Sequence, residues 1–413
     1  MTVVLGVLEK SSKGRDINNI QKNIDIIRRM STIEEQILAI EKEIRETPYH
    51  KGTEHHIGKL RARLSKLREK LLESSTKKGG GGGGYAVKKQ GDATIILIGP
   101  PSSGKSTLIN KFTNAQSRVA PYAFTTVSVI PGMMEYNDAK IQILDVPGLI
   151  EGAEEGKGRG REVLSVARGA DLVILMTDYK RSDALERIHK TLDRNGIRLN
   201  IVRPNVVYEK KVSGGITIHS NIKQDLNKEM MKNIINELGV KNADITINEK
   251  LTIERLIDAF SPNRVYLPAL FVINKSDLLT EKDKRHISEN VIYNDISFIS
   301  AETSSGLTEL KEKVWETLNF IRIYLISRDE APHYNSPLIT KKDVKLADIA
   351  SKIGTGFAER ITRAKIWGSG SKFPGERETG FEPATSSLAR KRTTTVLLPL
   401  QGFAFQRKRV FFN

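Results

Sequence analysis

The sequence predicts an α/β fold organised around a doubly wound, mostly parallel sheet. Largely apolar runs recur along the chain, at residues 94–98, 141–144, 172–176 and 270–273. Such runs are typical of strands that are buried on both faces of a parallel sheet. Segments long enough for helices separate the runs, and the first run leads directly into a glycine-containing turn. This alternation predicts strands that are connected by helices on both faces of the sheet.

A helical hairpin is predicted for residues 30–78, ahead of the first strand. Isoleucines follow one another at spacings of three and four over residues 33–44, and the same spacing returns over residues 57–71. This is the period of amphipathic helices. Pro48 disfavours helix at the residue before it, so we expect the two helices to fold back on each other.

The second helix of the hairpin is strongly basic. Its charged residues form either a solvated face or a contact for an anionic partner such as RNA. They are Lys59, Arg61, Arg63, Lys66, Arg68 and Lys70.

Two further segments interrupt the alternation of strands and helices. Residues 79–90 begin with six consecutive glycines and are predicted to be a flexible link, because glycine loses the most backbone entropy on ordering. Between Asp178 and Pro268 the chain is too long for a single connection. Strand-like runs at residues 205–209 and 216–219 flank a glycine turn there, so we predict an inserted small α/β subdomain at about residues 180–268.

Composition limits the classes of protein to be considered. The 413 residues suffice for two to three domains, and 66 Lys and Arg against 49 Asp and Glu give a net charge of +17. This charge favours an anionic partner, either nucleic acid or a membrane surface. The absence of cysteine excludes a disulfide scaffold, a thiolate zinc site and a cysteine nucleophile. No apolar run approaches the length of a membrane-spanning helix, so we expect a cytoplasmic protein without a membrane partner.

A phosphate-binding loop is predicted at residues 99–106, which read GPPSSGKS and match the pattern G-x-x-x-x-G-K-[ST]. The pattern lies between a predicted strand and a predicted helix, where backbone N–H groups and the helix dipole can face phosphates. Lys105 is expected to reach the β- and γ-phosphates, and the Ser106 hydroxyl to coordinate Mg²⁺. The nucleotide contacts predicted in this segment are Gly99, Ser102, Ser103, Gly104, Lys105, Ser106 and Thr107.

Guanine specificity is predicted from residues 274–277, which read NKSD after the last apolar run. Asp277 can accept hydrogen bonds from guanine N1–H and the 2-amino group, whereas adenine would leave this carboxylate unpaired. We expect Lys275 to lie along the base and Asn274 to tie its loop to the phosphate-binding loop. Ser300 and Ala301 are also predicted nucleotide contacts, and we expect the backbone N–H of Ala301 to face guanine O6. GTP and GDP are therefore the predicted ligands.

The γ-phosphate and magnesium contacts are predicted from two further segments. Asp145 ends an apolar run and is expected to hold Mg²⁺ through water, while the Gly148 N–H meets the γ-phosphate. Thr126 is expected to close over both, with Thr125 as the alternative one residue away. The predicted metal contacts are thus Ser106, Thr126 and Asp145, and the predicted catalytic groups are Lys105, Thr126 and Gly148. The sequence nominates no general base.

The order of these motifs resembles that of the Obg family of translation-factor-class GTPases. It is most similar to the family's archaeal and eukaryotic branch, the developmentally regulated GTP-binding proteins. The resemblance covers roughly residues 30–375. Its most specific segments are TEHHIGKL at 53–60, DVPGLIEGA at 145–153, GKGRGRE at 156–162 and GIRLN at 196–200.

This resemblance implies a GTPase domain over residues 91–330, with an insertion of the ribosomal-protein type. It also implies a C-terminal TGS domain of β-grasp fold, to which residues 337–340, 344–350 and 364–368 are similar. Proteins of this family are associated with ribosomes and RNA and commonly work with a small partner protein. We therefore expect a ribosome or RNA contact through the basic hairpin and the TGS region, and a small stabilising partner.

The sequence departs from the family pattern near the site and at both ends. Leu149 stands where a Ras-like enzyme carries the glutamine that orients water, so slow turnover is expected. Ser102 stands where Obg-type proteins carry an asparagine that helps to hold K⁺, which leaves potassium stimulation open. Residues 1–29 are interpreted as an upstream extension. Residues 376–413 are interpreted as an aberrant basic tail from an altered reading frame, which would leave a TGS domain at 331–375 without its final strand.

Three functions are compatible with these residues. The first is a GTPase that uses the nucleotide to order Thr126 and residues 152–160, a switch read by a ribosomal partner. The second is a non-catalytic RNA or ribosome adaptor with a structural GTP site, which Leu149 and the missing base favour. The third is a P-loop nucleotide kinase, which leaves residues 274–277 unexplained.

Overall fold

The computed structural model describes eleven stretches of the chain. They are residues 32–76, 90–113, 130–145, 166–291, 293, 295–325, 337–354, 356, 363–368, 377–380 and 407–412. The chain forms two compact units, of which one combines residues 1–84 with 201–266 and the other combines residues 85–200 with 267–413.

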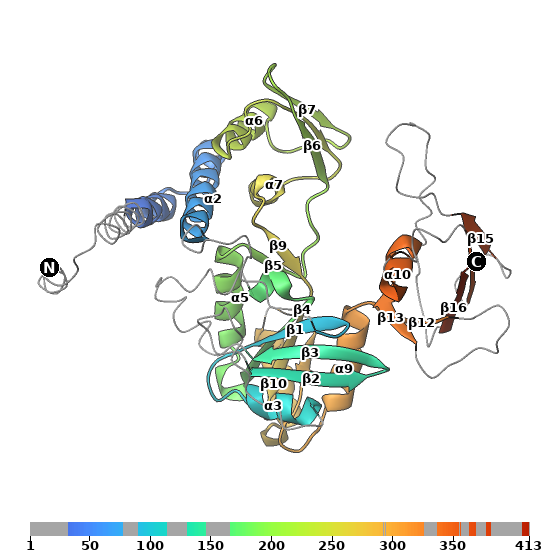
Figure 1. Ribbon diagram of the computed structural model, residues 1–413. Coiled ribbons are helices and arrows are strands. Elements are labelled where there is room, and N and C mark those ends of the chain that lie inside the picture. The colour runs from blue at the N-terminus through green and yellow to red at the C-terminus, as the bar shows by residue number, and fades with distance from the viewer. Residues whose placement is uncertain are drawn as a thin grey trace, which may run out of the picture. The chain divides into compact units, whose positions relative to one another are not determined.

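A six-stranded sheet forms the centre of the second unit (Figure 1). Its order is β11-β10-β4-β1-β3-β2, and every pair is parallel except β2 with β3. The doubly wound, mostly parallel sheet that the sequence predicts is thus confirmed. The strands are β1 (Ala93–Ile98), β2 (Ile130–Tyr136), β3 (Ala139–Asp145), β4 (Leu172–Asp178), β10 (Ala269–Asn274) and β11 (Ile296–Phe298).

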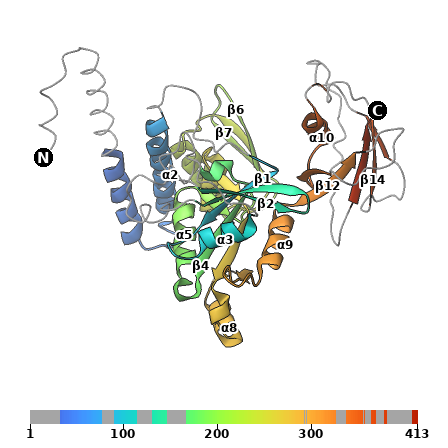
Figure 2. The ribbon, with the colours of Figure 1, turned by 60° about the horizontal axis from the view of Figure 1, so that its bottom comes forward.

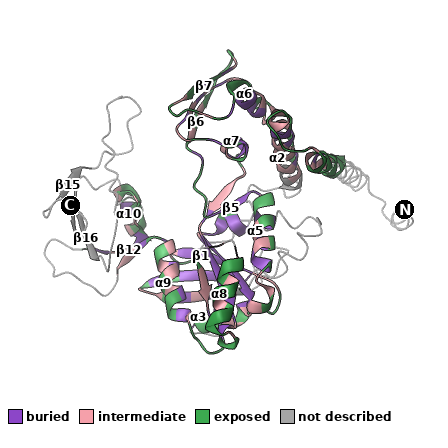
Figure 3. Ribbon diagram, turned by 180° about the vertical axis from the view of Figure 1, so that it is seen from behind, coloured by how far each residue is buried: buried purple, intermediate pink, exposed green. Residues whose placement is uncertain are grey.

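Apolar side chains on both faces of this sheet are covered by helices, so the strands appear buried in Figure 3. On one face, α3 (Lys105–Phe112) and α9 (Leu307–Thr317) share a core with the strands, and both lie next to β1, β2 and β3 in Figures 1 and 2. On the other face, α5 (Ala184–Arg194) packs against β4 and brings the His189 ring to Phe271 of β10. Because β1 and β4 are central and parallel, their carboxyl ends form one edge of the sheet.

The shorter elements of this unit lie between these strands and helices in the chain. They are η2 (Tyr179–Arg181), β5 (Ile197–Leu199), η3 (Ser276–Leu278) and α8 (Glu281–Asn290). The chain enters and leaves the insertion next to β5 and β9 (Val265–Leu267).

The insertion is narrower than the sequence predicts. Its unit contains residues 201–266, whereas we expected about 180–268. Residues 184–194 form α5, whose apolar positions Leu185, Ile188 and Leu192 are buried, so this segment belongs to the unit that contains the central sheet.

A small three-stranded sheet and two helices build the insertion. Its order is β6-β8-β7, with β8 parallel to β7 and antiparallel to β6. The elements are β6 (Val206–Lys210), β7 (Ile216–Ser220), α6 (Lys228–Glu237), β8 (Ala243–Ile247) and α7 (Ile253–Phe260). Residues that alternate along β7 and β8 face a core shared with α6 and α7, as expected for a sheet covered on one side.

The N-terminal helices form the predicted hairpin. Residues 32–46 and α2 (Glu54–Thr76) are helical, and Ile40, Leu60 and Leu67 are buried together between them. A second face of α2 packs on the insertion, where Ala62 joins the core of α6 and α7. The hairpin and the insertion therefore fold as parts of one unit, although more than 100 residues separate them in the chain.

Three of the six basic residues of α2 make internal contacts. Arg61 pairs with Glu254, Arg68 Nη2 lies 2.6 Å from Glu41 Oε1, and Lys66 Nζ donates to the Glu237 carbonyl at 3.0 Å. The interpretation of this helix as one basic contact face thus holds at most for the remaining three, Lys59, Arg63 and Lys70.

The C-terminal part of the chain forms a second sheet in the order β13-β12-β16-β14-β15. The elements are β12 (Phe320–Leu325), β13 (Leu338–Lys341), α10 (Leu346–Ile353), β14 (Arg363–Gly368), β15 (Arg377–Gly380) and β16 (Arg407–Phe412). The sheet begins within the predicted GTPase range 91–330 and continues past residue 375. Strand pairing uses backbone N–H and C=O groups, so residues of the predicted tail can supply strands. The identification of this sheet with a TGS domain stays a prediction.

In the part of the chain that the structure describes, no helix has the length and apolar character that crossing a membrane requires.

Candidate nucleotide-binding site

The predicted phosphate-binding loop connects the end of β1 to the start of α3. Two glycines are required by their surroundings. A Cβ at Gly99 would lie 1.9 Å from the Met176 carbonyl oxygen, and one at Gly104 would lie 2.1 Å from Asn274 Nδ2. Gly104 also has a φ of +94°, which L side chains rarely adopt. Only glycine allows β4 and β10 to approach the loop this closely.

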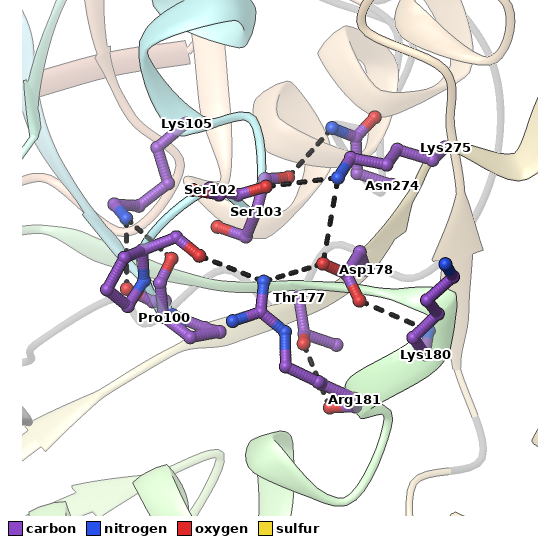
Figure 4. A network of polar contacts seen from close by, with 12 residues as sticks. Pro100, Ser102, Ser103, Lys105, Thr177, Asp178, Lys180, Arg181, Asn274 and Lys275 are labelled. Carbon is purple, nitrogen blue, oxygen red and sulfur yellow. Dashed lines mark hydrogen bonds and ion pairs between the residues drawn. The ribbon is translucent and has the colours of Figure 1, made fainter.

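Side chains from three segments hold the carbonyl groups of this loop (Figure 4). Lys105 Nζ donates to the carbonyls of Gly99 at 2.9 Å and Pro100 at 3.0 Å. Asn274 Nδ2 donates to the Ser103 carbonyl at 2.8 Å. The remaining two carbonyls, of Pro101 and Ser102, accept from Arg181 Nη2 at 2.9 Å and from Lys275 Nζ at 3.1 Å.

Asn274 links the two predicted binding loops. In addition to its bond to Ser103, its Oδ1 accepts the Ala301 N–H at 2.9 Å. The tie between Asn274 and the phosphate-binding loop is therefore present, as expected. The expectation that the Ala301 N–H faces guanine O6 stays a prediction, and in this structure the same N–H is donated to Asn274.

The other residues of the predicted base site lie on the same loops. Lys275 adopts a left-handed conformation with φ +62°, and Asp277 follows as an exposed residue of the turn η3. Ser300 is buried, and its Oγ accepts the Thr303 N–H at 3.2 Å. The structure thus leaves the Asp277 carboxylate at the surface, beside the loop that Asn274 organises.

Asp145 and Ser106 form the predicted magnesium position. Ser106 Oγ donates to Asp145 Oδ2 at 3.1 Å, while Asp145 Oδ1 is buried and finds no hydrogen-bond partner among the described residues. Burial raises the pKa of Asp145, although the Lys105 charge and the Ser106 hydrogen bond oppose this shift. An unpaired buried carboxylate oxygen is costly, and a cation would relieve that cost. The two residues therefore fit Mg²⁺.

The composition of the site also fits a magnesium ion that is held largely by a nucleotide. Among the described residues, no group of three or more His, Asp or Glu side chains could hold a metal alone. Mg²⁺ at nucleotide sites takes one or two protein ligands together with phosphates and waters. The buried Ser103 hydroxyl also has no hydrogen-bond partner within this loop.

Asp178 and Arg181 are site residues that sequence reasoning missed. Asp178 ends β4, is buried, and accepts from Arg181 Nη2 at 2.6 Å, and Lys275 Nζ lies 3.7 Å from it. Burial alone would raise the pKa of Asp178, but Arg181, Lys275 and the Lys180 N–H together lower it. The position of Asp178 at the end of a predicted central strand was a signal that could have identified it.

Several predicted residues are not covered by this geometry. Thr125, Thr126, Gly148 and Leu149 lie outside the described residues, so their predicted roles stay predictions. Thr107 lies half-buried in the first turn of α3.

Two family models match this chain, and together they cover nearly all of residues 94–320. Residues 94–210 match the model described as "50S ribosome-binding GTPase", and residues 213–320 match "C-terminal region of MMR_HSR1 domain". An uncharacterized GTP-binding protein of Methanocaldococcus jannaschii is 44% identical over 84% of this chain and 88% of its own length. Developmentally-regulated GTP-binding protein 2 of Homo sapiens is 38% identical over 83% of this chain and 94% of its own length.

A third relative comes from a plant. Developmentally-regulated G-protein 3 of Arabidopsis thaliana is 40% identical over 84% of this chain and 95% of its own length. The relatives share this level of identity over nearly their full length, and the P-loop and the NKxD loop lie on one mostly parallel sheet. These findings confirm the predicted family. The chain is a GTP-binding protein with a GTPase domain, and it belongs to the family of developmentally regulated GTP-binding proteins.

Proposed function

We propose that this protein binds GTP with Mg²⁺, hydrolyses it slowly and acts as a nucleotide-dependent switch. The observation that carries the proposal is the position of the polar side chains Lys105, Asp145 and Asn274. They come from three different segments and lie at one edge of the central sheet, which is where parallel α/β sheets bind ligands.

The phosphate end of the site would use Lys105, Ser106 and Asp145. The Lys105 ammonium donates to two loop carbonyls, and a β- or γ-phosphate oxygen offers it a stronger, charged acceptor nearby. Ser106 would contribute its hydroxyl to Mg²⁺, and Asp145 would act through water, using its buried Oδ1. Bound Mg²⁺ would neutralise charge that develops on the phosphates.

The base end would use residues 274–277. The exposed Asp277 carboxylate would accept from guanine N1–H and the 2-amino group, and adenine would offer it no equivalent donors. Lys275 would cover the base with its aliphatic stem while its ammonium holds the Ser102 carbonyl. GTP would therefore be preferred over ATP.

Hydrolysis would be slow because Leu149 cannot orient a water molecule. Thr126 and the Gly148 N–H would contact the γ-phosphate, and loss of that phosphate would release them, which is a common switch in GTPases. Potassium stimulation is a further question, since Ser102 provides a hydroxyl where an asparagine would be expected.

Phosphate release from GTP and from ATP tests the enzyme, measured with Mg²⁺ in potassium and in sodium buffer. We expect turnover of GTP alone. The Lys105→Ala variant should show none, because it removes the charge nearest to the phosphates. Equal release by both proteins would instead support the adaptor function, which Leu149 and the lack of a nominated base favour. Transfer of phosphate to an added nucleotide would indicate a kinase.

We also propose that the nucleotide-dependent switch acts on a ribosome or on RNA that this protein binds. The net charge of +17 supports this, as does the match to a family of ribosome-binding GTPases. Arg63 and Lys70 are the exposed basic residues of α2 and are the contacts proposed on the hairpin. The C-terminal sheet would add a second contact, and a small stabilising protein would be a further partner.

Co-sedimentation with ribosomes at increasing salt tests this association. The Arg63→Glu/Lys70→Glu variant should bind more weakly and with a smaller salt dependence, because fewer phosphates are neutralised. Lys282→Glu/Arg285→Glu on the exposed face of α8 is the matched control for charge. Equal binding by the two double variants would exclude the hairpin as a contact.

A further inference from the structure

Five consecutive carbonyl groups of the phosphate-binding loop, from Gly99 to Ser103, each accept a hydrogen bond from a side chain. Four of these bonds come from residues of the sequence motifs, namely Lys105, Asn274 and Lys275. The fifth, to Pro101, comes from Arg181, which belongs to no motif and lies on the short turn η2 after β4.

The carbonyl that Arg181 holds belongs to a peptide unit with a special place in the loop. Pro100 and Pro101 have no N–H, so the Ser102 N–H is the first one after Gly99. In a planar trans peptide the C=O of one residue and the N–H of the next point in opposite directions. A donor that fixes the Pro101 carbonyl therefore also fixes the direction of the Ser102 N–H.

The Pro101–Ser102 peptide unit needs hydrogen bonds from outside the loop because the backbone of Ser102 is strained. Ser102 has a φ of +60°, a left-handed conformation that costs a non-glycine residue about 1 kcal/mol. Arg181 on one side and Lys275 on the other hold the carbonyls of Pro101 and Ser102.

Arg181 is itself well anchored. Its Nη2 donates to Asp178 Oδ2 at 2.6 Å as well as to Pro101, and its own carbonyl accepts from Thr177 Oγ1 at 2.9 Å. The Asp178 carboxylate is buried and also lies 3.7 Å from Lys275 Nζ (Figure 4). The Arg181 guanidinium presents several donors in a fixed plane, and its Nη2 holds the Asp178 carboxylate and the Pro101 carbonyl at the same time.

We propose that Arg181 is a positioning residue for the diphosphate of the bound nucleotide. It holds the Pro101–Ser102 peptide so that the Ser102 N–H donates to a phosphate oxygen, and Asp178 keeps it in place. The inference rests on the proposed function, because it assumes that this loop binds a nucleoside diphosphate. Arg181 acts through the backbone and does not contact the base, so it contributes to phosphate affinity and leaves guanine selectivity unchanged.

Release of a fluorescent GDP analogue from the full-length chain tests the inference. Arg181→Ala should release GDP about tenfold faster than wild type, the effect of losing one charge-assisted hydrogen bond. The ratio of the dissociation constants for IDP and GDP should stay within about twofold, because IDP lacks only the 2-amino group.

Arg187→Ala is the matched control, because Arg187 is an exposed arginine of α5 whose Nη2 lies 3.4 Å from Oδ2 of the exposed Asp183. GDP release by Arg181→Ala within about twofold of this control would overturn the inference, and so would a changed IDP to GDP ratio. Should Arg181→Ala fail to fold, GDP release by Arg181→Lys is compared with GDP release by Arg187→Lys, and the same outcomes support or overturn the inference. A wild-type chain that binds no GDP would instead refute the proposed function.

Discussion

The buried Asp145 carboxylate at the end of β3 destabilises the nucleotide-free chain, and binding of a cation can remove this destabilisation. One of the carboxylate oxygens is buried and has no hydrogen-bond partner in the part of the chain that the structure describes, and burial raises the pKa of Asp145 above the ordinary value for aspartate. Asp145→Asn should therefore stabilise the nucleotide-free chain. The same change should weaken Mg²⁺-dependent GDP binding about tenfold, because a charged ligand for the ion is lost.

The pH dependence of this effect follows from the direction of the pKa shift. A raised pKa in the folded state means that the stability contributed by protonated Asp145 is lost as pH rises from the unfolded value through the folded one. The stability difference between Asp145→Asn and wild type should thus be small in acid and grow to a plateau towards neutral pH. Urea unfolding at several pH values measures it, with the exposed Asp183→Asn as control. A difference that does not vary with pH would contradict the assigned cause.

A glycine can be required because its φ is positive or because a Cβ would meet a neighbouring atom. Comparison of Gly104 with Gly214 distinguishes these two reasons. Gly104 has a φ of +94° and an added Cβ would meet Asn274, whereas Gly214 has a similar φ of +99° with no atom within 4 Å. Gly214→Ala should cost only the backbone strain of about 1 kcal/mol. Gly104→Ala should also displace Asn274 and so abolish GDP binding at micromolar nucleotide. Calorimetric titration with GDP checks this, and equal affinity in the two variants would show that Asn274 is not displaced.

At the scale of elements, α2 has two packing faces rather than one. Its leucines Leu60, Leu64 and Leu67 pack on the first helix of the hairpin, while Gly58 and Ala62 lie against the insertion. The small residues let α2 and α6 approach closely. The basic residues of α2 lie between these faces, which explains why Arg61, Lys66 and Arg68 make internal contacts.

Gly58→Leu tests this close approach. A Cβ at Gly58 would lie 2.9 Å from Ile234 Cδ1 and 3.2 Å from Met230 Cε, so overpacking should cost about 1 to 3 kcal/mol. Helix propensity acts in the opposite direction, since leucine is favoured over glycine by about 0.8 kcal/mol. Hydrogen exchange should nevertheless be faster in α2 and α6. Arg63→Leu on the exposed face is the control, and slower exchange in Gly58→Leu would show that α6 does not pack here.

At the scale of the whole molecule, each unit combines segments that are distant in sequence. The C-terminal sheet is an example, because β16 from the last residues pairs with both β12 and β14. Arg409 is in register with Tyr324 on one side and Trp367 on the other. Among the described strands, β16 is therefore the one that joins β12 and β13 to β14 and β15.

Arg409→Pro should disrupt this sheet and leave nucleotide binding intact. Proline lacks the N–H that the ladder of a central strand uses, and within sheets it is confined to edge strands, strand starts and bulges. Arg409→Ala removes the same side chain but keeps the N–H and should preserve the sheet. Hydrogen exchange of β12 and β14 distinguishes the two variants, while GDP affinity reports on the other sheet. Equal protection in both would mean that β16 is not part of this sheet, as the interpretation of residues 376–413 as an aberrant tail would expect.

Local sequence determined the elements that carry the nucleotide site. The apolar runs predicted four central strands, because a strand covered on both faces must be apolar along its length. The loop at 99–106 and the tetrapeptide at 274–277 were found from spacing, since backbone phosphate contacts and base recognition require particular residues at fixed intervals. These features depend on neighbours in the chain, so one sequence suffices to predict them.

Only the tertiary structure decided which distant residues meet. It placed Arg181 on the Pro101 carbonyl, gave the Ala301 N–H to Asn274, and joined α2 to the insertion. It also drew residues beyond 375 into the C-terminal sheet. Such contacts depend on how strands and helices pack, and a long-range hydrogen bond or a close approach at a glycine has no periodic signature in the sequence. The sequence thus determined the family and the chemistry of the site, while packing determined which side chains hold that site in shape.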